Sequence, residues 1–347
     1  CGMPLDNTPS PPAKAPDPYV EYLSDISETH DVVAGEDIVG DNGMLLAKKG
    51  TLIKKSVADR LLLGRPSKSL DEVLHIGKCM SRQTLMADYD SLFARWKDCE
   101  LVHLRNGFAA QLNQLIFRRE IPYLLMARLT VMRECLRKAY VKCLFVSWIS
   151  AQIADELKLS SESVYSAFFA GLFHKVGLLH IPQALAQDKF EPTPQNMAMY
   201  LEHVRLGANV IKKTGHYSTE VFEAIMHHHD SHDISGAPIL NTSTVNPVLA
   251  HIIALGEIVY EMRQGQDGAE NASLSNIMPY LKVNAATQST PSYTGLLRLL
   301  HRCNLKRPYR SAGDEDLNKM RLKLQDNTTS IQQVLTELVS LSDCYTP

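Results

Sequence analysis

Apolar residues recur at intervals of three and four positions through most of this chain. The pattern begins near Gln83 and is clear between Leu124 and Leu136, where it places the apolar side chains on one side of a helix. The same spacing predicts helices between residues 83 and 157 and over residues 160–173, 220–229, 248–262, 293–301 and 314–341. We therefore predict that the body of the protein is all-α.

A different pattern precedes these helices. Two short runs, residues 36–39 and 44–47, flank an Asn42-Gly43 pair, which is a strong short-range signal for a β-hairpin. Ser56 is then predicted to cap a short helix that ends at Leu63, and residues 71–76 are predicted to form another strand. Residues 19–78 are therefore predicted to be a small α+β N-terminal domain.

The remaining boundaries follow from local composition. Residues 1–18 are rich in proline and poor in large apolar side chains, so we expect a disordered tail. Residues 79–140 are predicted to be a helical linker, and residues 141–347 to be the main helical domain. The polar stretch 264–292 is rich in Gly, Asn and Ser at its ends and is predicted to be an insertion in that domain.

Composition narrows the classes of protein to consider. The chain has 347 residues, 45% of them hydrophobic, and a formal net charge of −2 without a strongly basic block, so nothing indicates a nucleic-acid polymer as partner. No apolar run reaches the roughly 18 residues of a membrane-spanning helix. The seven cysteines are scattered, which favours reduced thiols and a cytoplasmic location. Cys1 would also suit a lipoprotein, a reading that the rest of the chain disfavours.

Four histidines carry the most informative chemistry: His174, His203, His228 and His229. Imidazoles spread in this way suit a di-metal hydrolase, which also needs carboxylates to bridge the ions and balance their charge. Neighbouring residues on a helix point about 100° apart, so the paired histidines suit two adjacent ions. The residue that follows His174, however, is Lys175, a cation where a carboxylate is needed.

Three segments around these histidines resemble the HD-GYP family, a branch of the HD superfamily of metal-dependent phosphohydrolases. FFAGLFHKVGLLHIP is similar to the segment with the family's His-Asp doublet, and EHVRLGANVI to the segment with the next ligand histidine. EAIMHHHDSHDISGAP is similar to the paired-histidine helix and the Gly-Tyr-Pro loop. The resemblance covers about residues 142–262 and implies an HD-type helical bundle. In some members a small domain, to which residues 19–78 are similar, precedes this bundle. Members of this branch hydrolyse the bacterial second messenger cyclic di-GMP.

The resemblance also implies which positions would hold metal. Lys142 stands where the first ligand histidine is expected, Lys175 replaces the Asp of the doublet, and Leu178 replaces a lysine that is thought to assist the phosphate chemistry. The ligand positions that keep a suitable side chain are His174, His203, His228, His229 and Glu257, the last with Glu in place of Asp.

Two further features resemble the family in part. In the loop, Gly236 and Pro238 remain but Ala237 replaces the Tyr. Arg307 and Arg310 belong to an RPYR run that closely follows the last acidic ligand in many relatives, whereas here it comes some 50 residues after Glu257. Because arginine binds phosphate through two hydrogen bonds, both arginines are candidate nucleotide contacts together with Lys142 and Lys175. An exposed cluster at the start of a helix stays open as the alternative.

The two lysines change the expected chemistry. Lys175 puts a positive charge where the bridging carboxylate would be negative, and an amine can bind a metal only after losing its proton. We therefore expect no intact binuclear centre, at most a single Fe, Mn or Zn ion, and no residue that can be assigned to catalysis.

Three functions remain open from the sequence. The leading one is a catalytically impaired HD-GYP-like regulator in cyclic di-GMP signalling, without enzymatic activity, that binds the nucleotide or another signalling protein such as a GGDEF-domain protein. The first alternative is an atypical metal-dependent cyclic di-GMP phosphodiesterase with a reduced metal site and Glu257 as its acidic ligand. The second is a scaffold like the HDOD proteins, which the segment AFFAGLFHKVG also resembles.

Overall fold

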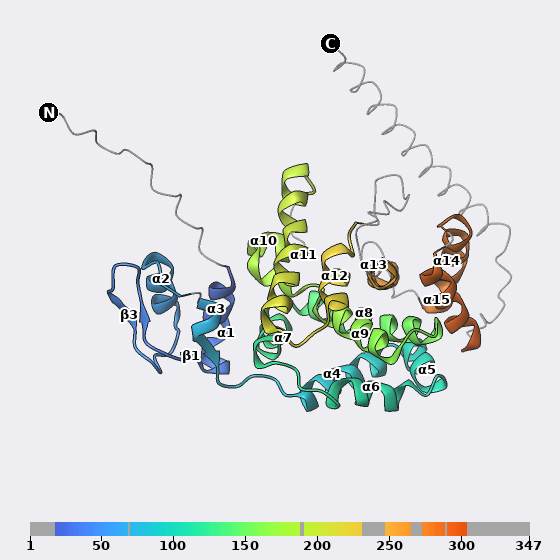
Figure 1. The fold of residues 1–347 in the computed structure, drawn as a ribbon, viewed down its shortest axis with the longest axis horizontal. Helices are drawn as coiled ribbons and strands as arrows, with labels where there is room; N and C mark the ends of the chain where they lie inside the picture. Colours follow the sequence, from blue (N-terminus) through green and yellow to red (C-terminus); the bar gives the residue numbers. More distant parts are fainter. Residues whose placement is uncertain are drawn as a thin grey trace, which may run out of the picture. The chain divides into compact units, whose positions relative to one another are not determined.

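The structure, a computed structural model, describes residues 18–68, 70–187, 191–230, 247–264, 273–288 and 290–303. The described chain is mainly helical and begins with a small α+β unit, which confirms the predicted fold class (Figure 1). The predicted helix over residues 314–341 and most of the predicted tail lie outside the described residues.

The N-terminal unit contains two pairs of short antiparallel strands and three helices. β1 (Val32–Ala34) pairs with β4 (Leu74–Ile76), and β2 (Ile38–Val39) pairs with β3 (Leu45–Ala47). The helices are α1 (Tyr19–His30), α2 (Lys55–Leu63) and α3 (Leu70–Val73). The β2–β3 pair is the hairpin predicted around Asn42-Gly43. The prediction for Ser56 was wrong: α2 begins one residue earlier, its N-cap is Lys54, and no side chain caps it.

The region predicted as long helices between residues 83 and 157 is divided into five. These are α4 (Arg82–Arg95), α5 (Lys97–Arg105), α6 (Phe108–Phe117), α7 (Tyr123–Cys135) and α8 (Arg137–Glu156). The divisions have local causes. Gly107 adopts a left-handed conformation with φ of 65° between α5 and α6, and Pro122 immediately precedes α7.

The second half of the described chain adds the helices that surround α8. They are α9 (Ser161–Phe173), the 3₁₀ helix η1 (Val176–His180), α10 (Gln183–Ala186), α11 (Pro194–Thr214), α12 (Thr219–His227), α13 (Pro247–Gln264), α14 (Leu274–Gln288) and α15 (Pro291–Arg302). α9 lies where the sequence predicted a helix over residues 160–173, and Ser160 caps it by accepting a hydrogen bond from the backbone of Ser163. α12 ends two residues before the predicted boundary, so His228 and His229 lie in the turn after it.

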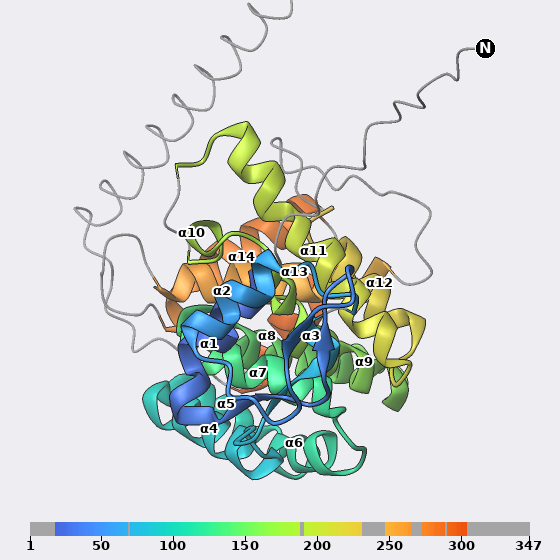
Figure 2. The same cartoon turned by 90° about the vertical axis from the view of Figure 1, so that its left-hand side faces the viewer.

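α8 lies at the centre of the helical body. From Cys143 to Ala154 every side chain is buried, which is the pattern of a helix covered on all sides. It packs against α7, α9, α13 and α15, and both views show it beside α9 (Figure 1, Figure 2). Because α9 and α13 also pack against α12, and α12 against α11, the ends of four elements are brought together beside α8.

The N-terminal unit is joined to this body by specific hydrogen bonds. The Tyr123 hydroxyl on α7 accepts the Ile76 N–H at 2.6 Å and donates to the Ile76 carbonyl at 3.2 Å. The Thr130 hydroxyl accepts the Met80 N–H at 3.0 Å. On the other side of α7, the Tyr19 ring of α1 lies 5.4 Å from the His180 ring of η1. The contact between Tyr19 and His180 places α1 against the short helix that follows Lys175.

The predicted insertion over residues 264–292 includes α14. Leu274, Ile277 and Leu281 of this helix are buried, and the Asp98 carboxylate accepts the Leu274 N–H at 2.7 Å. Asp98 also accepts hydrogen bonds from the buried Arg263 at 2.5 and 3.0 Å, so the start of α14 is tied to the end of α13. The described part of this stretch therefore belongs to the packed body, and its origin as an insertion stays a prediction. Among the described residues, no helix is both long and apolar enough to cross a membrane.

Candidate functional site

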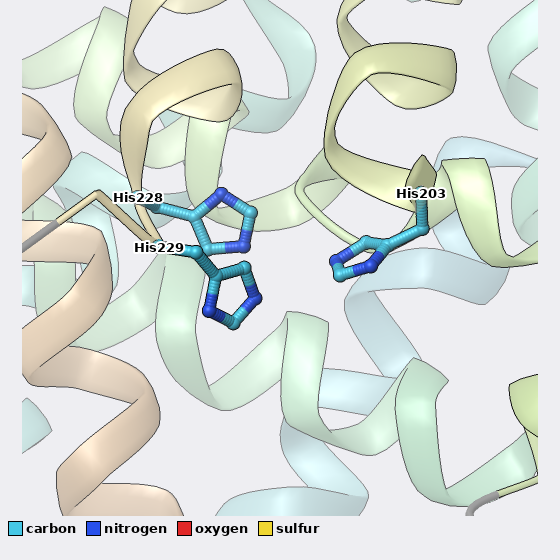
Figure 3. Close-up of side chains that lie close together, drawn as sticks. All are labelled: His203, His228 and His229. Atoms are coloured by element: carbon cyan, nitrogen blue, oxygen red, sulfur yellow. The ribbon is translucent and has the colours of Figure 1, made fainter. Parts of the chain in front are cut away.

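Six of the side chains predicted from the sequence meet at one place, and we refer to them as the histidine–lysine cluster. They are His174 and Lys175 after α9, His203 on α11, His228 and His229 after α12, and Glu257 on α13. His229 keeps a quarter of its side chain exposed, whereas the other five are buried or nearly so. Figure 3 shows His228 and His229 on one side of the site and His203 on the other.

Three of the histidines are oriented in the same way. Nδ1 of His174, His203 and His228 lies 2.7 Å from the carbonyl oxygen three residues earlier, on Gly171, Tyr200 and Ile225 respectively. A carbonyl can only accept, so each Nδ1 carries the proton and each neutral ring keeps a lone pair on Nε2. Backbone bonds of this kind fix the orientation of histidines that bind metals.

Lys175 provides the cation of the cluster. Its Nζ lies 2.7 Å from Oε1 of Glu257, 3.2 Å from Nε2 of His203 and 3.1 Å from Nε2 of His229. An ammonium has three N–H donors. These three neighbours therefore satisfy it completely, and two of the imidazole lone pairs are occupied by a lysine proton.

Glu257 balances that charge. Burial disfavours its carboxylate, but the Lys175 ammonium outweighs burial and holds the pKa of Glu257 well below its usual range. Its two oxygens lie 3.3 Å from Nε2 of His174, 3.6 Å from Nε2 of His228 and 3.7 Å from Nε2 of His229. The cluster thus contains one negative and one positive side chain.

Three of the histidines, His174, His203 and His228, are held neutral. Burial, and then the Lys175 ammonium, keep the pKa of His203 well below the usual value, and burial followed by His229 does the same for His228. Burial also lowers the pKa of His174, against the opposing effect of Glu257. Nε2 of His174 and Nε2 of His228 make no properly directed hydrogen bond to any described residue. Two buried lone pairs therefore remain available beside Glu257.

Lys142 lies next to this cluster rather than within it. Its ammonium forms an ion pair with the exposed Glu261, one turn after Glu257 on α13, and lies 5.7 Å from the centre of the Tyr260 ring. Burial lowers the pKa of Lys142, but Glu257 and Glu261 outweigh burial and raise it above the ordinary value. Both lysines in replaced ligand positions are thus neutralised by acidic residues of α13.

Sequence reasoning missed two neighbours of the cluster. The Tyr200 ring lies 4.8 Å from the His203 ring, and the centre of the Tyr200 ring lies 5.7 Å from Lys175 Nζ. Tyr200 precedes His203 by three residues, and Glu261 follows Glu257 by four. Residues three or four apart on a helix lie on the same side, so this spacing could have identified both residues as neighbours of the site.

Other predicted positions fall elsewhere. Leu178 is buried in η1 as an apolar core residue. The loop residues Gly236, Ala237 and Pro238 and the arginines Arg307 and Arg310 lie outside the described residues. A cavity of about 370 Å³ lies away from the cluster, between α6 and the start of α9, and is lined by residues that include Arg119 and Tyr165.

The donor set can be compared with what metals require. His203, His228 and His229 each offer a nitrogen, and these atoms lie within 4.8 Å of one another, which suits a single transition metal better than two. Two closely spaced dications need anionic bridges, and Glu257 is the one carboxylate that contacts these histidines among the described residues. The described side chains thus supply one carboxylate to the three histidines, and protons of Lys175 already occupy two of the nitrogens.

Comparisons with known proteins agree with the arrangement. The HD domain family matches residues 107–289, which is more than half of the chain and includes every residue of the cluster. A cyclic di-GMP phosphodiesterase of Thermotoga maritima is 25% identical over 113 residues, covering 32% of this chain and 31% of that protein. The cyclic di-GMP phosphodiesterase response regulator RpfG of Xanthomonas campestris pv. campestris is 22% identical over 179 residues, covering 51% of this chain and 47% of that protein.

These matches thus span less than half of the length of either curated relative. No solved structure gives a significant match. The family match over most of the helical body, together with the position of the histidines inside it, identifies this chain as a member of the HD domain family, of the HD-GYP-like kind.

Proposed function

We propose that this chain is a non-catalytic regulator of cyclic di-GMP signalling. Its HD domain binds cyclic di-GMP, or a signalling protein in its place, without hydrolysing the nucleotide. The link to cyclic di-GMP is supported by the two relatives, both of which are named as cyclic di-GMP phosphodiesterases. The absence of hydrolysis is an inference from the cluster of this chain.

One observation carries the proposal. The Lys175 ammonium donates to Glu257, His203 and His229, the groups that a metal would otherwise use. A metal that binds there must displace a buried cation whose three donors are already satisfied, and it must overcome the repulsion between like charges. Metal-dependent hydrolysis relies on the ions to generate hydroxide and to stabilise the leaving oxygen, so a centre filled by lysine lacks both contributions.

The positive charges of Lys142 and Lys175 would support nucleotide binding only if they were released from their acidic partners. Lys142 is paired with Glu261, and Lys175 with Glu257, so neither is free to bind a phosphate in the described state. Binding of a phosphodiester group of the nucleotide at this position would require the exposed Glu261 to move away from Lys142. The protein-partner form of the proposal requires no such change.

Two measurements on the purified protein test this. Metal analysis by mass spectrometry is expected to find far less than one transition metal per chain, and a turnover assay with cyclic di-GMP is expected to show no product above background. Calorimetric titration with cyclic di-GMP then separates the two forms of the regulator. Binding supports the nucleotide form, and no binding at high micromolar ligand leaves the protein partner. Two bound metals, or turnover that a chelator abolishes, would overturn the proposal.

A second candidate is a phosphodiesterase that uses one metal. It is favoured by the two buried Nε2 lone pairs of His174 and His228, which have no hydrogen-bond donor among the described residues and face Glu257. This candidate predicts about one Fe, Mn or Zn ion per chain and activity that returns when that metal is added back after chelation. A glutamine at position 257 would remove its acidic ligand and should abolish both.

A further inference from the structure

The outer face of α2 in the N-terminal unit combines basic and apolar side chains that are exposed to solvent. Ala58 and Leu61 face the core, whereas Lys55, Arg60 and Leu63 are exposed. Positions 60 and 63 are neighbours on one side of a helix, so the leucine lies beside the arginine. Leu63 is 84% exposed, the highest value among the exposed large hydrophobic residues of the described chain.

Basic residues are concentrated around this helix. Residues 48–68 contain seven Lys and Arg, all exposed, and one acidic residue, Asp59, although the chain as a whole has a net charge of −2. They occur as two adjacent pairs, Lys48-Lys49 and Lys54-Lys55, and three single residues, and so form no long basic block in the sequence. Lys68 pairs with Glu36. The other six form no ion pair with any described residue: Lys48, Lys49, Lys54, Lys55, Arg60 and Arg65.

Three acidic residues limit the positive surface, and one of them, the exposed Asp41, lies beside Arg65, whose carbonyl accepts the Asp41 N–H at 2.9 Å. Asp59 lies on the same face of α2 between Lys55 and Arg60, and Asp37 accepts the backbone N–H of Lys49 at 2.7 Å. The six unpaired basic side chains still outnumber them, so the surface around α2 keeps an excess of positive charge.

Exposed apolar side chains also gather in this small unit. Val39, Met44 and Leu45 of the β2–β3 hairpin are 38%, 57% and 45% exposed. Val39 and Leu45 are cross-strand partners in the hairpin register. With Leu63, the unit exposes four large apolar residues next to its unpaired basic ones.

The composition of the face indicates the kind of partner. Protein interfaces are enriched in arginine and depleted in lysine, whereas four of these six basic residues are lysines. Lysines distributed over a surface suit a diffuse negative charge, which requires no matching geometry. A prominent leucine among basic residues is the other property of surfaces that bind bilayers, because the apolar side chain enters the boundary between headgroups and acyl chains.

We propose that the outer face of α2, with the turns on both sides of it, binds an anionic membrane surface. The attraction is electrostatic, with Leu63 adding a small apolar contribution. This proposal is independent of the proposed function, since it involves no residue of the histidine–lysine cluster.

The test is binding of the full chain to lipid vesicles by flotation. Vesicles of equal parts phosphatidylglycerol and phosphatidylcholine are compared with vesicles of phosphatidylcholine alone, at about 0.1 M and about 0.5 M salt. We expect binding to the anionic vesicles at low salt, weaker binding at high salt, and none to phosphatidylcholine. The variant with Lys54→Glu, Lys55→Glu and Arg60→Glu is expected to bind on the order of a hundredfold more weakly, at roughly fivefold for each basic residue lost. The Leu63→Ser variant is expected to bind several-fold more weakly.

A matched variant with Arg118→Glu, Lys282→Glu and Arg298→Glu changes the net charge equally at exposed positions outside the unit. It should bind like the unmodified chain. No binding of the unmodified chain to anionic vesicles, or an equal loss in the matched variant, would overturn the proposal. Binding to soluble polyglutamate but not to vesicles would assign the face to an acidic protein and would also overturn it. Circular dichroism of each variant confirms that it is folded.

Discussion

The Lys175 ammonium lies 2.7 Å from Oε1 of Glu257, and both side chains are buried among four histidines. A buried ion pair costs free energy of desolvation that its attraction offsets only when the remaining donors and acceptors are also satisfied. Here His203 and His229 accept the other two lysine protons. The pair and the histidines therefore depend on one another as a single unit.

Removing one charge of this pair should destabilise the protein strongly. Lys175→Met keeps much of the side-chain volume but leaves the Glu257 carboxylate buried without a cation. We expect the free energy of unfolding to fall by about 3–5 kcal/mol, as for other buried pairs that lose one partner. Glu257→Gln should have a similar effect because it leaves the ammonium unbalanced. Urea denaturation measures both.

The double variant Lys175→Met with Glu257→Gln supplies the control. It contains no unpaired charge, so we expect it to be more stable than the sum of the two single effects implies, with a coupling of about 1.5–3 kcal/mol. The exposed pair of Glu202 and Arg205 on α11 has an N–O distance of 2.6 Å and serves as the comparison. In a double-mutant cycle of the same design it should show a coupling below about 1 kcal/mol. Additive effects at Lys175 and Glu257 would mean that the two charges do not interact in solution.

Acid should destabilise the metal-free protein from near neutral pH downwards. The pKa values of His203 and His228 lie well below 6.5, and that of Glu257 well below 4.5. All three groups bind protons more readily in the unfolded chain, so unfolding takes up protons and the free energy of unfolding falls as the pH falls. The loss should begin near pH 6.5 with the histidines and continue below pH 4.5 with Glu257.

Urea denaturation at a series of pH values between about 7.5 and 5 measures this loss. Each histidine contributes at most about 1.4 kcal/mol per pH unit, so two contribute at most about 2.7 kcal/mol per unit. Replacing His203 and His228 with asparagine should weaken the dependence above about pH 5 and leave the contribution of His174. A free energy of unfolding that stays constant or rises as the pH falls through this range would contradict the assignment.

The general architecture was predictable from the sequence because it depends on regular patterns. Helical periodicity located the body, and the Asn42-Gly43 pair located the hairpin. The breaks were harder to predict, since Gly107 and Pro122 divide an almost continuous apolar pattern. The end of α12 was also misplaced, because His228 and His229 continue the pattern without being part of the helix.

The sequence predicted that the six residues of the histidine–lysine cluster lie together, but it did not predict their contacts. The sequence shows that Lys175 follows His174, but it does not determine the direction of a long, flexible side chain. The ammonium contacts His203 and His229, which come from two other elements, and Lys142 pairs with Glu261 from α13. Such contacts depend on how helices far apart in the sequence pack, and no local spacing records that.

Restoring the acid should restore metal binding. In Lys175→Asp the buried cation is absent and a second carboxylate stands beside Glu257, which gives dications the anionic ligands that they need. We expect Fe²⁺ or Mn²⁺ to raise the melting temperature of this variant in a concentration-dependent manner. At a metal concentration of about 100 times Kd the stabilisation would be about 2.7 kcal/mol. The unmodified chain should melt at the same temperature with metal and with chelator.

Lys175→Met is the matched variant for this experiment. It also lacks the ammonium but adds no carboxylate, so a shift as large as that of Lys175→Asp would mean that removal of the cation alone is sufficient. Metal-dependent stabilisation of the unmodified chain would show that the ammonium leaves the cluster easily.

Gly177 should be indispensable to the position of Lys175 because η1 and α11 are in direct contact there. A Cβ on Gly177 would lie 1.9 Å from the carbonyl oxygen of His203 and 2.6 Å from the Gly207 nitrogen. Neither backbone atom can move without displacing the helix. Gly177→Ala should therefore push η1 away from α11, and with it Lys175 away from His203. We expect a loss of about 1–3 kcal/mol or more in the free energy of unfolding, measured with urea.

Gly107→Ala separates this steric effect from backbone strain. Gly107 has φ of 65°, and no atom lies within 4 Å of a Cβ added there. Its substitution should therefore lower the free energy of unfolding only by the strain of holding alanine in the left-handed conformation, about 1–2 kcal/mol. If close packing positions Lys175, Gly177→Ala should also reduce the coupling between positions 175 and 257, whereas Gly107→Ala should leave it unchanged. An unchanged coupling in both variants would mean that Lys175 finds Glu257 without the support of the contact between η1 and α11.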